Sequence, residues 1–345
     1  MTSPERVRRA IDFGHPDRLP IIHAFLPGGL IRHREALLEV FRRYPSDFGP
    51  SEHEIPSSTH IGMEGYHRQY VDDWGVTWTE RYEGIIGIPT EYPLADWSAL
   101  DAFRPPEPPA CSGEQFDKHR AATAEHKRRY YTLASAGTLY ERLQQLRGYE
   151  NLAYDLVEDR LEIHRLADMV VEYNLGWITR GAKLGAHGMG FADDWGTQRQ
   201  LAISPQLWRR FFKPRYQRMF EAAQAGNCHV HFHSDGQIMA IIPDLMEIGV
   251  DCLNPQFSCM DLPALAQLVR GRLCILTDLD RQYVLPFGTP QQVKAHVREI
   301  VRLFATPAGG LIGRGEIGPD VPLQNVEAMF EAFAEYGVVA EAAGS

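Results

Sequence analysis

The feature that most constrains the fold of this chain is a regular alternation of short apolar segments with longer amphipathic segments after Tyr130. The short segments have the composition of buried strands and lie at 130–137, 187–196, 228–236, 250–257, 273–280 and 310–316. Helical patterns accompany them at 161–185, 205–226, 237–249, 261–269 and 290–305. Such an alternation predicts parallel β/α units.

The N-terminal part supplies the remaining strands of the predicted sheet. Residues 3–14 are expected to form a helix with Ser3 as its N-cap, and 19–25 a first buried strand. Residues 71–92 alternate apolar and polar side chains, which indicates two extended segments or a hairpin, one of them a further strand. The total of eight favours a closed barrel. An open doubly wound sheet is the alternative, but the GxGxxG turn typical of that fold is missing.

We therefore expect an α/β protein, a (β/α)8 TIM barrel with an N-terminal elaboration. The whole chain, 1–345, is interpreted as one domain, with the elaboration and first strands in 1–110 and regular β/α units in 111–345.

Charge and cysteine content narrow the functional class. The net charge of −10 and the pI near 5.8 argue against nucleic acid or an anionic membrane as a partner. Five cysteines without CxxC spacing indicate neither a disulfide framework nor a zinc ribbon. The sequence contains neither a signal-peptide pattern nor a membrane-spanning segment. These observations predict a cytoplasmic protein, monomeric or homodimeric, that acts on a small molecule.

Polar side chains gather where the predicted strands end. In a TIM barrel this is the C-terminal face, where catalytic groups lie. The residues concerned are Asp193 and Asp194, His233 and Asp235, Asn254 and Gln256, Asp278 and Asp280, and Arg314 and Glu316.

The densest of these segments is CHVHFHSDG, residues 228–236. His229, His231 and His233 share one face of the strand, because side chains alternate with a period of two. A packing network is the favoured interpretation for His229, and for His231 packing and function remain open. For His233 followed by Asp235 we favour a ligand or acid–base role.

The neighbouring strand ends carry weaker signals. Of Asp193 and Asp194, one is expected to face the pocket, where it holds a substrate group or acts as a catalytic acid or base, and the other to cap a helix or bond within the loop. Trp195 is a candidate pocket wall, although tryptophan more often packs in a core. Asn254, Gln256, Asp280, Arg314 and His231 are the further candidate substrate-binding residues.

Sequence blocks along the chain resemble the uroporphyrinogen decarboxylase-like superfamily. They include PERVRRAIDFGHPDRLP, DDWGTQRQLAISPQLWRRFFKPRY, HSDGQIMAIIPDLMEIGVDCLNPQ and GPDVPLQNVEAMFEAF. The resemblance implies a (β/α)8 barrel with one of two activities. One branch decarboxylates uroporphyrinogen without a cofactor, and the other contains methyltransferases that use a corrinoid protein and a zinc ion held by a His-x-Cys pair and a later Cys.

Departures from both branches are informative. The arginine-rich MRQAGR loop of the decarboxylases is replaced by HAFLPGGLIRHRE, which disfavours a substrate with eight carboxylates. The resemblance places His233 and Asp235 at the His-x-Cys positions, and Gly315 or Glu316 at the later Cys. A metal, zinc foremost, would then be bound by His233 and Asp235 with Glu316 or His231.

Three hypotheses follow. The first is a metal-assisted methyltransferase or O-demethylase with a corrinoid partner protein, in which Asp193 or Asp194 handles a proton. The second is a cofactor-free decarboxylase of uroporphyrinogen or of a smaller acid, with His233 as the proton donor and Asp194 stabilising positive charge on the substrate. The third is a barrel that binds a ligand without turnover.

Overall fold

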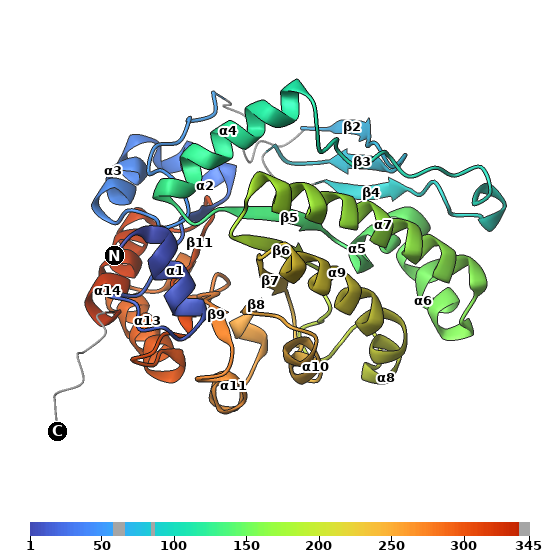
Figure 1. Ribbon diagram of the computed structural model, residues 1–345. Coiled ribbons are helices and arrows are strands. Elements are labelled where there is room, and N and C mark those ends of the chain that lie inside the picture. The colour runs from blue at the N-terminus through green and yellow to red at the C-terminus, as the bar shows by residue number, and fades with distance from the viewer. Residues whose placement is uncertain (58–65, 84–86, 338–345) are drawn as a thin grey trace.

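Six parallel strands form the main wall of the molecule. The computed structural model describes residues 1–57, 66–83 and 87–337 (Figure 1). The strand order is β10-β9-β8-β7-β6-β5, and each strand pairs in parallel with its neighbour. The bounds are β5 (Leu133–Gly137), β6 (Gly188–Ala192), β7 (His229–Ser234), β8 (Cys252–Pro255), β9 (Cys274–Leu276) and β10 (Leu311–Ile312). All six lie inside the predicted strand segments.

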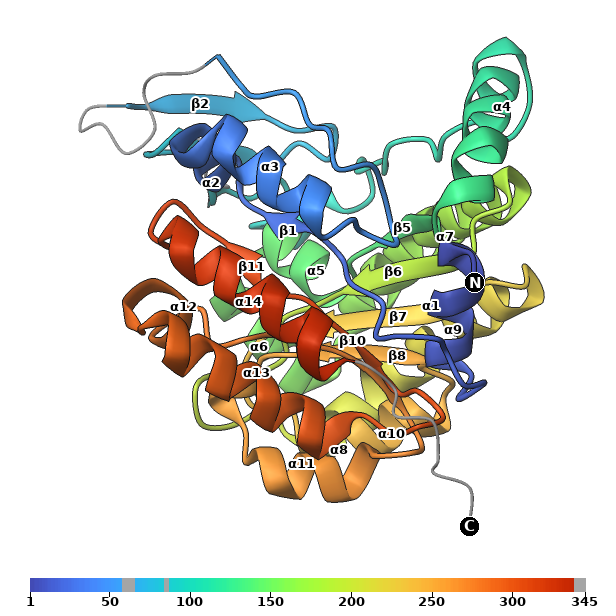
Figure 2. The ribbon, with the colours of Figure 1, turned by 90° about the vertical axis from the view of Figure 1, so that its left-hand side faces the viewer.

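Two short strands continue this wall toward closure. The chain leaves β10 and reaches β11 (Glu316–Ile317), which pairs in parallel with β1 (Ala24–Phe25), and Ile21 bridges to Gly313 (Figure 2). Asp47 connects the segments that lead into β1 and β5. Its N–H donates to the Ile21 carbonyl and its carbonyl accepts from the Tyr131 N–H, both at 2.9 Å. Parallel strands and helices arranged in this way form a TIM-barrel fold, as predicted.

The strand that we expected between 71 and 90 is not part of the barrel wall. The chain there forms a separate antiparallel sheet of β2 (Arg68–Val71), β3 (Thr77–Glu80) and β4 (Ile88–Glu91). The side chains of β2 and β4 are mostly exposed, whereas a barrel strand is covered on both faces. The prediction of a hairpin was therefore right, but the prediction that one of its strands belongs to the barrel wall was wrong. Residues 84–86, within the predicted hairpin, lie outside the described part of the chain.

Helices pack on the outside of the wall (Figure 1). Phe232 of β7 points outward and packs edge-to-face against Tyr216 and Phe220. The outward-facing side chains of β7 therefore pack against the helix that carries these two residues. The helices after the N-terminal region are α4 (Glu114–Arg129), α5 (Tyr140–Arg147), α6 (Tyr149–Glu158), α7 (Leu161–Leu184), α8 (Pro205–Leu207), α9 (Lys213–Ala225), α10 (Ile242–Glu247), α11 (Leu262–Val269), α12 (Val284–Phe287), α13 (Pro290–Phe304) and α14 (Leu323–Tyr336).

Short helical turns complete the outer layer. A π-helical turn, Trp208–Phe212, joins α8 to α9, and 3-10 turns occupy Trp97–Ala99 and Phe257–Cys259. The N-terminal elaboration adds α2 (Pro27–His33) and α3 (Glu35–Arg43). The pattern at 237–249 was longer than the helix that forms there, because only Ile242–Glu247 is helical. In the part of the chain that the structure describes, no helix combines the length and apolar character needed to span a bilayer.

Helix α1 (Ser3–Ile11) closes the N-terminal end of the barrel. Its N-cap is Thr2 and not Ser3, since the Thr2 hydroxyl accepts from the Glu5 N–H. The buried stripe Val7, Ala10 and Ile11 packs in one cluster with Tyr131, Cys252, Cys274 and Ile312. In Figure 2, α1 lies beside the starts of β7 and β8. Because α1 covers this end, we look for the candidate site at the C-terminal strand ends, where TIM barrels carry their active sites.

Candidate active site

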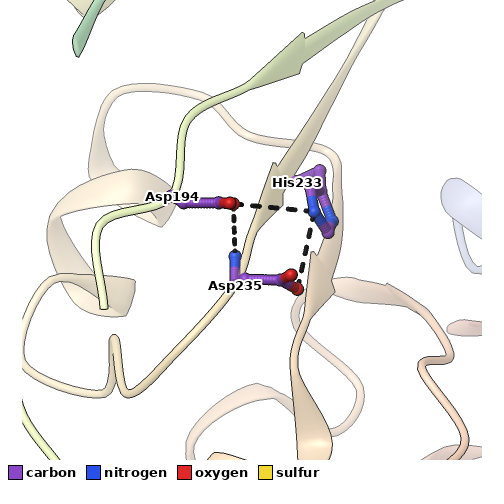
Figure 3. A group of neighbouring side chains, drawn as sticks. All are labelled: Asp194, His233 and Asp235. Atoms are coloured by element: carbon purple, nitrogen blue, oxygen red, sulfur yellow. Dashed lines mark hydrogen bonds and ion pairs between the residues drawn. The ribbon is translucent and has the colours of Figure 1, made fainter. Parts of the chain in front are cut away.

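Three side chains at the ends of β6 and β7 point toward one another (Figure 3). His233 Nε2 lies 3.8 Å from Asp194 Oδ1 and 3.6 Å from Asp235 Oδ1. The Asp235 N–H donates to Asp194 Oδ1 at 2.9 Å. One ligand atom from each residue lies within 4.8 Å of the others, and within residues 1–57, 66–83 and 87–337 this is the group of His, Cys, Asp and Glu that could hold a metal ion.

Backbone packing between two loops sets this geometry. The Trp195 N–H donates to Ser234 Oγ, and the Gly196 N–H donates to the Asp235 carbonyl at 3.0 Å. Gly236 has φ +79, and a Cβ placed there would lie 2.1 Å from the Gly196 backbone. Only glycine fits so close a contact at that φ. The loops DDWG and HSDG are therefore held against each other, which brings Asp194 beside Asp235.

Asn254 fixes the orientation of the His233 ring. Its amide nitrogen donates to the Leu276 carbonyl at 2.8 Å, so its Oδ1 faces His233 Nδ1, also at 2.8 Å. An oxygen acceptor at Nδ1 places a proton there, so in the neutral ring the lone pair belongs to Nε2, which faces the two carboxylates. Asn254, expected to bind substrate, thus lies behind His233 as a positioning residue.

The residues present fit a divalent cation. Asp235 Oδ1 is buried and, among the described residues, has no hydrogen-bond partner. A buried carboxylate oxygen without a partner is costly, and a cation at this point would satisfy it. One imidazole nitrogen with carboxylate oxygens is a ligand set used for zinc, iron and manganese.

Two arginines stand behind the Asp194–His233–Asp235 group. Arg281 forms an ion pair with the other oxygen of Asp235, Oδ2, and its Nη1 lies 3.5 Å from Glu316. Arg314 bridges Glu316 and Asp278, with both N–O distances at 3.0 Å. Glu316, expected as a metal ligand, is thus held by two guanidinium groups and lies outside the group that could hold a metal. Arg281 was missed by the sequence argument, which considered only strand ends.

Glu141 is a second residue that sequence reasoning missed. Burial, followed by the nearby charges of Asp193 and Asp194, raises the pKa of Glu141 to about 8. Its carboxyl accepts a backbone hydrogen bond from Asp194. Glu141 lies on α5, for which we had predicted no helix, so the sequence held no signal that would place it here.

Asp193 and Trp195 shape the site from the core. Asp193 is buried and accepts from the N–H groups of Leu139 and Glu141 at 2.8 Å and from the Tyr216 hydroxyl at 2.5 Å. Burial raises the pKa of Asp193 to about 6. Trp195 is fully buried and donates to the same hydroxyl, so it does not line an open pocket as we had expected. Of the two aspartates, Asp193 meets the first turn of α5 and Asp194 faces the site.

Of the other predicted residues, two hold loops near the site in place and one lies far from it. Gln256 Oε1 accepts from the Gly236 N–H at 2.8 Å and braces the HSDG loop. Asp280 accepts from the N–H groups of Gln282 and Tyr283 and shapes the loop before α12. His231 is buried at the other end of the barrel, where its Nε2 lies 3.0 Å from the Tyr131 hydroxyl.

The fold and these strand-end groups define a TIM-barrel protein with a candidate active site at its C-terminal face. Residues 88–336 match the family model described as uroporphyrinogen decarboxylase (URO-D). The chain belongs to this family, as the sequence blocks had indicated.

Individual relatives come from both functional branches. The chain is 26% identical over 188 residues to a methylated-thiol–coenzyme M methyltransferase of Methanosarcina mazei, covering 54% of this chain and 48% of the relative. It is 27% identical over 175 residues to a uroporphyrinogen decarboxylase of Thermus thermophilus, covering 50% of this chain and 48% of that one. The chain thus spans about half the length of the curated relatives it matches.

A solved structure of a methyltransferase from Methanosarcina mazei shares the fold. It superposes with a TM-score of 0.70 at 15% identity, over 97% of this chain and 99% of that one. At this level of identity the likeness establishes the architecture.

Proposed function

We propose that this protein is a metal-dependent methyltransferase or O-demethylase that takes a methyl group from a small molecule and passes it to a corrinoid carried by a partner protein. The observation that carries the proposal is the Asp194–His233–Asp235 group, with its ligand atoms within 4.8 Å and with Asp235 Oδ1 buried and without a hydrogen-bond partner among the described residues. The likeness to a methyltransferase supports the same reaction class.

In this proposal His233, Asp194 and Asp235 hold the cation. A bound divalent ion would supply Lewis-acid polarisation of the oxygen or sulfur that carries the methyl group. Asn254 keeps the His233 proton on Nδ1, so that Nε2 remains a ligand atom. Arg281 pairs with the other oxygen of Asp235, and Asp193 holds the first turn of α5 in place beside the group.

The set differs from the thiolate site implied by the family resemblance. Carboxylate oxygens are harder ligands than thiolates, and they leave open positions for substrate and water. We therefore include oxygen-bound methyl groups among the substrates, alongside methylated thiols.

Elemental analysis of the purified protein tests the proposal. We expect about one divalent transition metal per chain after reconstitution, and its loss in His233→Ala. His164→Ala is the matched control, because His164 also pairs with an aspartate, Asp159, at 3.0 Å but on the surface. Metal that persists in His233→Ala, or a wild-type protein that binds none of zinc, iron, manganese and cobalt, would contradict the proposal.

Cofactor-free decarboxylation is the second candidate. The observation that favours it is the pair Arg281 and Arg314 near the Asp194–His233–Asp235 group, since guanidinium groups bind carboxylates, together with the likeness to the Thermus decarboxylase. Carbon dioxide release by the metal-free protein from a small carboxylic acid would favour this function over methyl transfer.

A further inference from the structure

A chain of alternating charges leads away from the Asp194–His233–Asp235 group. Asp235 pairs with Arg281, Arg281 approaches Glu316, Glu316 pairs with Arg314, and Arg314 pairs with Asp278. These side chains are between 2% and 27% exposed, so they are largely shielded from solvent. Charges in such a place must nearly balance, because water screens them poorly.

Carboxylates outnumber guanidinium groups in this chain of charges, since Asp235, Glu316 and Asp278 face Arg281 and Arg314. Asp194, which is more exposed at 46%, adds a fourth carboxylate beside His233. One divalent cation on the Asp194–His233–Asp235 group would neutralise the set. The same cation would draw charge from Asp235 and so weaken its pairing with Arg281.

Arg281 is the arginine that this change would release. Its contact with Glu316 is long, at 3.5 Å, whereas both contacts of Arg314 are 3.0 Å. A guanidinium has five N–H donors and matches a carboxylate with two parallel hydrogen bonds. Once Asp235 is engaged by the cation, a second carboxylate can take its place on the arginine.

We infer that Arg281 is a specificity-determining residue that binds a carboxylate of the substrate once the cation has engaged Asp235. The inference rests on the proposed function, because it needs the cation. It narrows the substrate class to small methylated molecules that also carry a carboxylate. Arg281 and the cation would contact different oxygens of Asp235, Oδ2 and Oδ1, and each positive charge weakens the attraction of the carboxylate for the other. Removal of Arg281 should therefore strengthen cation binding and weaken carboxylate binding.

The probes are methoxyacetate and methoxyacetamide, which differ little in size and differ in charge. Their dissociation constants are measured by titration of the cobalt-loaded protein, with the visible cobalt spectrum as the readout. We expect the wild-type protein to bind the acid at least about tenfold more tightly than the amide, a difference of about 1.4 kcal/mol. In Arg281→Gln the dissociation constants of the acid and the amide should agree within about twofold. The preference of Arg281→Lys for the acid should lie between those of wild type and Arg281→Gln.

The cobalt affinity of the same variants is expected to change in the opposite direction to their affinity for the acid. Arg281→Gln should bind cobalt about threefold or more tightly than wild type, since a competing positive charge is gone. Arg42→Gln is the control, because Arg42 also bridges two carboxylates, Glu35 and Glu52, but on the exposed surface. Arg42→Gln should change neither the cobalt affinity nor the preference for the acid over the amide.

Each contrary result has a separate meaning. An acid preference that survives in Arg281→Gln overturns the inference, because the cation alone would then bind the carboxylate. Weaker cobalt binding in Arg281→Gln also overturns it, because Arg281 would then serve only to orient Asp235. A wild-type protein that binds cobalt without preferring the acid overturns the inference and leaves the proposed function standing. If wild type binds no metal at all, both are overturned.

Discussion

His231 and His233 project from the same face of β7, yet the two ends of the barrel treat them differently. His231 is buried beneath α1 and shares the Tyr131 hydroxyl with His229, at 3.0 and 2.9 Å. Gly188 makes room for this contact, since a Cβ there would lie 2.7 Å from the hydroxyl. His233 is half-buried, with one ring nitrogen satisfied by Asn254 and the other facing two carboxylates.

The difference teaches that depth in the barrel, and not residue type, divides these histidines between structure and chemistry. At the closed N-terminal end both ring nitrogens of His229 and Nε2 of His231 have hydrogen-bond partners, as buried polar groups require. At the C-terminal end, which we call the open end, Asp235 Oδ1 has no hydrogen-bond partner among the described residues. Substitutions at the two ends should therefore affect different measured quantities.

The largest effect is expected at the closed end. Tyr131→Phe removes the hydroxyl that both imidazoles use and leaves a buried ring nitrogen without a partner. We expect the free energy of unfolding in urea to fall by about 2–3 kcal/mol, with metal content unchanged. Tyr92→Phe, which removes a weak 3.4 Å hydrogen bond to the Pro89 carbonyl, should change it by less than about 0.5 kcal/mol. Loss of metal from Tyr131→Phe would show that the two ends are not independent.

The next largest effect is expected on metal affinity at the open end of the barrel, where His233 lies. Asn254→Leu removes the acceptor that keeps the His233 proton on Nδ1, and metal affinity should fall by about ten- to a hundredfold. Asn254→Asp also loses the donor to the Leu276 carbonyl but still accepts from Nδ1, so its metal affinity should stay within about threefold of wild type. Equal losses in both variants would mean that Asn254 acts through the Leu276 contact and not through the ring.

The smallest effect is a pH dependence at the closed end. Burial, followed by the charges of Arg8 and Lys127, lowers the pKa of His187 to about 4, and its Nδ1 accepts from the Thr132 N–H. Because an unfolded histidine has a pKa near 6.5, the unfolded chain binds the extra proton first. The contribution of His187 to stability is thus complete above about pH 6.5 and is lost as the pH falls toward 4.

His187→Asn isolates this contribution, since the Asn side-chain oxygen can accept in place of Nδ1 without titrating. Between pH 7.5 and 5 the wild-type protein should lose about 1–2 kcal/mol more stability than the variant, measured by urea unfolding at both pH values. Parallel losses in the two proteins would rule out His187 as the titrating group.

The sequence sufficed for the strands of the main wall and for the central pair of the site. Period-two and helical patterns located β5 to β10, because buried parallel strands are short apolar runs between amphipathic helices. His233 and Asp235 followed from their position at a strand end. Asp194 was expected to handle a proton, which stays a prediction, and its place among the candidate metal ligands was not foreseen.

What the sequence could not predict depends on contacts between distant segments. Arg281 is 46 residues from its partner Asp235, and Glu141 joins the site from a helix that carried no clear pattern. Trp195 and Asp193 adjoin Asp194 in sequence but turn into the core, where Tyr216 meets both. Glu316 carried a suitable ligand atom, but two arginines already hold it.

Asp47 has a consequence for where this protein can be cut. Its buried carboxylate accepts from Arg6 at 2.6 Å, from Arg18 at 3.0 Å and from the Ile21 N–H at 3.0 Å, while its backbone connects the segments that lead into β1 and β5. The family match begins at residue 88, after all of these contacts. A fragment that starts there would leave the edges of β5 and β11 bare, and bare strand edges invite aggregation. We therefore predict that the segment recognised by similarity, residues 88–336, does not fold stably without the residues before it.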